Sequence, residues 1–92
     1  MASTVEQVRK ELENVVRRLK ETKDTVAGLK NEWPSVNASG DKKEIADWKK
    51  RRDQVDEVRR ELKADRQALG ILINENEHLH SLKEEFQQAL EV

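Results

Sequence analysis

The two histidines, His78 and His80, are the residues whose chemistry best suits metal binding or proton transfer. They lie two positions apart, so on a helix their side chains are rotated by about 200° and cannot hold one ion together. Glu75 precedes His78 at the Glu-x-x-His spacing of di-iron helical bundles. Such sites need a second set of inward-facing carboxylates, which this sequence lacks. We therefore expect no metal site, and interpret both histidines as part of a solvated helix face.

The other groups that could support catalysis are absent or isolated. Cysteine does not occur, so no thiolate nucleophile and no disulfide is available. The serines have no histidine and acid arranged to activate them. The three glycines are scattered, so they form no phosphate-binding loop. We expect neither an enzyme nor a bound cofactor.

The dominant pattern is a seven-residue repeat of apolar residues on both sides of Trp33-Pro34. On a helix this period gathers apolar side chains into one narrow stripe, which must be buried against another helix. Before the break the stripe comprises Val5, Val8, Leu12, Val15, Leu19, Val26, Leu29 and Trp33. After the break it comprises Ile45, Trp48, Val55, Val58, Leu62, Leu69, Leu72, Leu79, Phe86 and Leu90. The repeat predicts a coiled coil.

Composition agrees with this prediction. Charged residues make up 40% of the 92 residues and aromatic residues only 3%, which is typical of long helices and coiled coils. Eighteen basic and nineteen acidic residues nearly cancel, so no strong overall field attracts nucleic acid or an anionic membrane. No apolar run is long enough for a signal peptide or a membrane span. We expect one small domain in a cytoplasmic protein.

Capping and breaking residues predict a first helix over about residues 4–33. Ser3 or Thr4 can cap its first turn. Pro34 should end it, because proline has no amide proton and disfavours the helical conformation of the preceding residue. Small and turn-forming residues then predict a loop over residues 34–40.

A second, longer helix is predicted over about residues 41–91, with Asp41 as its N-cap. The repeat crosses Gly70 in phase, so we favour one continuous helix over a second bend at Gly70 that would make three helices. The predicted fold is an all-α antiparallel helical hairpin assembled as a dimeric helical bundle. We favour the closed form of the hairpin over the helix-exchanged form. The sequence does not choose between a parallel and an antiparallel dimer.

The first helix is too short to cover about the last twenty residues of such a second helix. The uncovered stripe is the expected surface for self-association and for a protein partner. It comprises Leu72, Asn76, Leu79, Leu82, Phe86 and Leu90. Asn76 falls in the seam, where it could fix the register of a parallel dimer, or could mark a solvated helix end. This surface predicts a homodimeric scaffold or adaptor.

Two further features carry alternatives. A basic face formed by Lys49, Arg52, Arg59 and Arg66 could bind nucleic acid or an anionic membrane. Residues 41–69 contain ten basic and eight acidic residues, so we favour a coiled-coil surface laced with salt bridges. Trp33 and Trp48 flank the loop, either as an aromatic binding site or, as we favour, as a lock on the turn end.

The hairpin outline resembles the antiparallel coiled-coil fingers that bind small GTPases and the helical N-terminal regions of vesicle SNARE proteins. Residues 43–48 (Lys-Glu-Ile-Ala-Asp-Trp) and 70–76 (Gly-Ile-Leu-Ile-Asn-Glu-Asn) look similar to the second helix of syntaxin N-terminal domains. Those domains have a third helix after a break, where this sequence is predicted to continue straight. The resemblance implies an alternative function as a vesicle-trafficking or small-GTPase-binding helical module.

Overall fold

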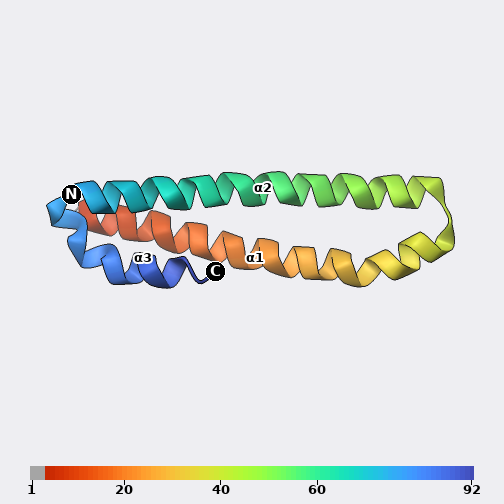
Figure 1. The fold of residues 1–92 in the computed structure, drawn as a ribbon, viewed down its shortest axis with the longest axis horizontal. Coiled ribbons are helices and arrows are strands. Elements are labelled where there is room, and N and C mark those ends of the chain that lie inside the picture. Colours follow the sequence, from red (N-terminus) through yellow and green to blue (C-terminus); the bar gives the residue numbers. More distant parts are fainter. Residues whose placement is uncertain (1–3) are drawn as a thin grey trace.

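A computed structural model describes residues 4–92, and nearly all of them are helical (Figure 1). In chain order the elements are α1 (Thr4–Ser39), α2 (Lys42–Glu75), the 3-10 helix η1 (Glu77–Leu82) and α3 (Lys83–Ala89). α1 and α2 run antiparallel over most of a molecule that extends 56 × 21 × 18 Å, and α3 folds back beside the first half of α1 (Figure 1). The all-helical class is confirmed, and α1 and α2 pack as a hairpin closed within one chain.

The predicted end of the first helix at Trp33 is wrong, because α1 continues through Pro34 to Ser39. A proline inside a helix removes one backbone hydrogen bond and bends the helix, but it does not prevent packing on either side. Trp33 and Val36 are both half-buried, so the segment after Pro34 still contributes apolar contact. The Ser39 hydroxyl donates to the Val36 carbonyl at 2.7 Å in the last turn.

The connection between α1 and α2 is much shorter than the predicted loop over residues 34–40. Gly40 has a φ of +66°, in the left-handed region that glycine adopts without steric cost. Asp41 follows it as the predicted N-cap of α2, and this prediction is confirmed: its carboxylate accepts from the amides of Lys43 at 2.9 Å and Glu44 at 3.4 Å. The predicted cap at Ser3 lies outside the described residues.

The second helix does not run to residue 91, as predicted, but ends at Glu75. It passes through Gly70 without a break, and the chain turns at Asn76 instead, where φ is −116° and ψ is 112°. The Asn76 side chain donates to the Leu72 carbonyl at 2.8 Å, so it partners one of the carbonyls that the helix end leaves free. Folding back also buries apolar residues of η1 that a straight helix would leave in water.

The core lies where three helical segments meet. Leu62, Ile73, Leu79 and Leu82 are the most deeply buried large side chains, with at most 2% of their surface exposed. They join a cluster from α1 that comprises Val8, Leu12, Val15 and Leu19. We call residues 4–21 together with 60–92 the three-helix end, and residues 22–59 the two-helix end. At the two-helix end the stripe is covered on one side only, so Val26 and Val55 are half-buried and Val58 is 36% exposed.

Candidate binding groove between the second and third helices

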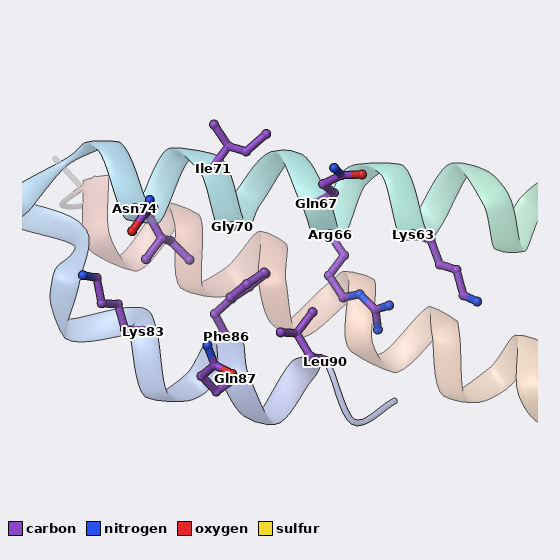
Figure 2. Close-up of a pocket in the computed structure, with 11 residues that line it drawn as sticks. Lys63, Arg66, Gln67, Gly70, Ile71, Asn74, Lys83, Phe86, Gln87 and Leu90 are labelled. Atoms are coloured by element: carbon purple, nitrogen blue, oxygen red, sulfur yellow. The ribbon is translucent and has the colours of Figure 1, made fainter.

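An open groove of about 760 Å³ lies at the three-helix end, between α2 and α3 (Figure 2). We call it the α2–α3 groove. Its lining comprises Lys63, Arg66, Gln67, Gly70, Ile71, Ile73 and Asn74 from α2 and Lys83, Phe86, Gln87 and Leu90 from the α3 segment. Figure 2 shows Phe86 and Leu90 pointing from α3 toward α2, with Lys83 and Lys63 near opposite ends of the view. The groove exists because the chain turns at Asn76.

The apolar centre of the groove depends on the contact between Phe86 and Gly70. A Cβ atom added at position 70 would lie 2.8 Å from Cε1 and 2.9 Å from Cε2 of the Phe86 ring, closer than real Cβ atoms approach. Only glycine therefore lets the ring lie against the backbone of α2. Phe86 is half-buried in this position, and Leu90 beside it is 46% exposed. Ile71 lines the outer edge of the groove, is 52% exposed and points away from α3 (Figure 2).

All the ionisable side chains that line the groove are basic. Arg66 is half-buried, and its Nη1 donates to the Ala89 carbonyl at 3.0 Å, near the C-terminal end of α3. Within residues 4–92, the side-chain ammonium groups of Lys63 and Lys83 form neither a hydrogen bond nor an ion pair. Among the described residues, no carboxylate lines the groove to offset these three cations. The lining therefore offers apolar contact, amide hydrogen bonds and positive charge, a combination suited to noncovalent binding.

The structure redistributes the residues of the predicted self-association stripe. Leu79 and Leu82 are 1% and 0% exposed in the chain's own core, so the expectation that nothing in the chain covers them is wrong. Phe86 packs on Gly70, and Asn76 ends α2. Leu72 and Leu90 are the two members that stay largely exposed, at 40% and 46%. The physical reason is the turn at Asn76, which brings the last part of the stripe back onto α1 and α2.

Sequence reasoning missed α3, and with it the groove residues Lys63, Gln67, Gly70 and Lys83. One signal was available: Asn74-Glu75-Asn76 places two asparagines within three residues, and asparagine competes with the helix backbone for hydrogen bonds. The prediction of one continuous helix followed the seven-residue repeat instead. That repeat continues through this segment, so it did not reveal that the helix is interrupted.

The four residues of the predicted basic face all lie on α2, but their surroundings differ. Arg66 lies in the α2–α3 groove, whereas Arg52 lies over Trp48, with its guanidinium carbon 5.4 Å from the ring centroid. Lys49 and Arg59 are exposed on α2. Binding of nucleic acid or membrane by this face stays a prediction.

The two tryptophans form a packed cluster at the two-helix end. Their ring centroids are 4.4 Å apart, and Trp48 is only 7% exposed. The Trp48 indole donates through Nε1 to the Leu29 carbonyl at 2.8 Å. In a regular helix the amide of residue 34 donates to the Lys30 carbonyl, but Pro34 has no amide hydrogen. The Leu29 carbonyl that accepts from the indole is therefore next to the carbonyl that loses its helical partner. The geometry supports the interpretation that the two tryptophans hold α1 and α2 together next to the turn.

The histidines lie apart from the groove, on the surface of η1, where both are exposed. Over residues 4–92, no three histidine, aspartate or glutamate side chains gather closely enough to hold a metal ion. None of the helices in the described part of the chain has a stretch long and apolar enough to cross a membrane. Comparison of the chain with family models, curated proteins and solved structures finds no match.

Proposed function

We propose that this chain is a non-enzymatic adaptor module that binds a protein partner, and that the α2–α3 groove receives a helical segment of that partner. The observation that carries this proposal is the groove itself, with an apolar centre and a border of amides and basic groups. A hydrophobic groove between two helices is a recurring docking site for an amphipathic helix.

The dimensions of the groove fit such a segment. Its lining residues on α2 span positions 63 to 74 on one helix face. Eleven residues of helix extend about 16 Å, or three turns, so a partner helix of similar length can lie along the groove. The exposed side chain of Leu90 lies along this path, and that of Ile71 lies at its outer edge (Figure 2).

A titration followed by amide NMR spectra tests the proposal. The ligands are three synthetic amphipathic helical peptides of about 15 residues that share one apolar stripe and differ only in the charge flanking it. We expect at least one of them to shift the amide signals of Gly70, Ile71 and Leu90. Absence of such shifts with all three peptides at millimolar concentration would refute the proposed site.

Two substitutions make this test specific to the groove. Leu90→Glu places a charge in the apolar centre and should abolish binding. Val58→Glu is the matched control, because Val58 is also an exposed apolar residue but lies at the two-helix end. This variant should bind as the parent chain does, and circular dichroism should show that both variants keep their helices.

Self-association is a second candidate, favoured by the exposure of Leu72 and Leu90 within the predicted self-association stripe. The two leucines lie on different faces, since Leu90 lines the groove and Leu72 points from the opposite side of α2. We propose that a second copy covers one of them in a dimer. Sedimentation equilibrium should then show a mass that rises with protein concentration, and the double variant Leu72→Asp, Leu90→Asp should remain a monomer. A monomer at every concentration of the parent chain would eliminate this candidate.

A further inference from the structure

We infer that the helix bound in the α2–α3 groove is acidic: its apolar stripe is flanked by glutamate or aspartate residues that meet Lys63, Arg66 and Lys83. This inference rests on the proposed function, which assigns the groove to a helical partner but not the charge of that partner. Three features of the described residues carry it: unpaired lysines, an anchored arginine and an apolar centre.

The unpaired lysines lie toward the two ends of the groove (Figure 2). Lys63 is the first lining residue of α2, and Lys83, from the start of α3, lies near Asn74 at the other end. Neither has a carboxylate partner among residues 4–92. The two cations can therefore pair with carboxylates about three helical turns apart on a ligand, one near each end of its apolar stripe.

Arg66 adds a cation between these ends, and its position is held by the protein. Its Nη1 donates to the Ala89 carbonyl, near the C-terminal end of α3, where a helix carries partial negative charge. The arginine thus offsets the charge that would repel an acidic ligand. A guanidinium has several N–H donors, so Arg66 keeps others for a carboxylate of the partner.

The apolar centre distinguishes a protein helix from other acidic ligands. Phe86 rests on Gly70 and Leu90 is exposed beside it (Figure 2), so the ligand must bring an apolar stripe as well as carboxylates. A nucleic acid offers phosphates but no apolar stripe. A basic amphipathic helix would face three like charges, and none of the groove residues could neutralise it.

Binding of three matched peptides, measured by calorimetry, tests the inference. They share one apolar stripe and carry flanking glutamates, glutamines or lysines. At about 50 mM salt we expect the glutamate peptide to bind about tenfold more tightly than the glutamine peptide, since a partly exposed ion pair contributes a factor of about two to five. The lysine peptide should bind most weakly, and the difference should shrink at about 0.5 M salt.

Variants that remove positive charge show which lysines produce the preference for the glutamate peptide. The double variant Lys63→Gln, Lys83→Gln should lose most of the preference for the glutamate peptide while still binding the glutamine peptide. The control Lys49→Gln, Lys50→Gln removes the same charge from exposed positions of α2 at the two-helix end and should keep the preference. Equal loss in both variants would mean that overall charge, rather than the groove, selects the ligand, and would overturn the inference.

The remaining outcomes separate this inference from the proposed function. If the glutamine or lysine peptide shifts the groove amides and binds at least as tightly as the glutamate peptide, the groove is a helix site and the acidic preference is wrong. If no peptide binds there, both proposals fail. If the signals of Gly70 and Leu90 change with protein concentration in the absence of peptide, a second copy occupies the groove and the inference is overturned.

Discussion

The two ends of this molecule use the same seven-residue repeat, but they bury it to different extents. At the three-helix end, Leu79 and Leu82 are at most 1% exposed, and Leu12 and Leu62 are at most 3% exposed. At the two-helix end, Val58 is 36% exposed and Val26 and Val55 are half-buried. Two helices can cover each other along one line only, whereas a third segment closes a second side of the stripe. Leu29 and Trp48 are also buried at the two-helix end, at 6% and 7%, but the side chains with at most 3% exposure all lie where the third segment packs.

The two-helix end holds together through a few specific contacts. Trp33 and Trp48 pack at its tip, and the Trp48 indole bonds to the Leu29 carbonyl. Thr22 occupies a stripe position and is 8% exposed, with its hydroxyl donating to the Arg18 carbonyl at 2.7 Å. Because this end buries less apolar surface, we expect its amides to exchange with solvent faster than those of the three-helix end.

The largest expected effect is the loss of a core leucine at the three-helix end. Leu82→Ala should destabilise the fold by about 3 kcal/mol, because it removes a fully buried side chain and leaves a cavity. Val55→Ala at the two-helix end should cost about 1 kcal/mol, since this side chain is already half in water. Urea unfolding measures both values, and equal costs would contradict the difference between the two ends.

Replacement of two glycines by alanine should have opposite effects at the two ends. Gly28→Ala should stabilise the protein by about 1 kcal/mol, because a Cβ there meets no atom within 4 Å and alanine favours the helix. Gly70→Ala should destabilise it by about 2 kcal/mol, because the methyl group would displace the Phe86 ring.

Gly70→Ala in a chain that lacks the Phe86 ring shows why this substitution is destabilising. In a Phe86→Ala chain the clash is absent, so Gly70→Ala should become neutral or stabilising. Thermal unfolding of the four chains in this cycle gives the coupling. A cost that persists without Phe86 would show that the ring is not what requires glycine at this position.

The indole hydrogen bond predicts an effect of about 1 kcal/mol at the two-helix end. Trp48→Phe keeps an aromatic ring but removes the donor to the Leu29 carbonyl. The expected loss of about 1 kcal/mol is the usual net contribution of one such hydrogen bond. Trp33→Phe keeps an aromatic ring in contact with Trp48 and leaves the hydrogen bond intact, so it serves as the comparison. The Trp48 substitution should cost more in urea unfolding; the reverse order would remove the hydrogen bond from the explanation of the lock.

The smallest effects should come from ion pairs, and they should be similar at both ends. Arg9 and Glu85 join α1 to α3 at 3.1 Å, and Arg51 and Glu32 join α2 to α1 at 2.9 Å. The side chains of both pairs are 40–52% exposed, so double-mutant cycles should give a coupling of about 0.5 kcal/mol or less that weakens with salt. A coupling well above this value for Arg9–Glu85 would mean that charge, rather than apolar burial, holds α3 in place.

Local signals predicted local structure well. Asp41 caps α2 as its sequence context indicates, and the repeat placed Leu12, Leu19, Leu62 and Leu69 in a helical core. The predictions failed where a local preference competed with packing. Pro34 disfavours a helix, yet α1 continues because Trp33 and Val36 contact the rest of the chain on either side of it. The candidate groove was not predictable, because its two walls come from segments that the repeat had joined into one helix.

The sequence by itself determined the helical class, the stripe that must be buried and the N-cap of α2 at Asp41, because periodicity and capping act over a few residues. Only the tertiary structure decided that α2 ends at Asn76 and that α3 returns to the core. Two conformations of this segment compete in stability. A continuous helix keeps its backbone hydrogen bonds, whereas a turn buries Leu79, Leu82 and part of Phe86. The advantage of the turn comes from contacts with α1 and α2, so it exists only once those helices have packed.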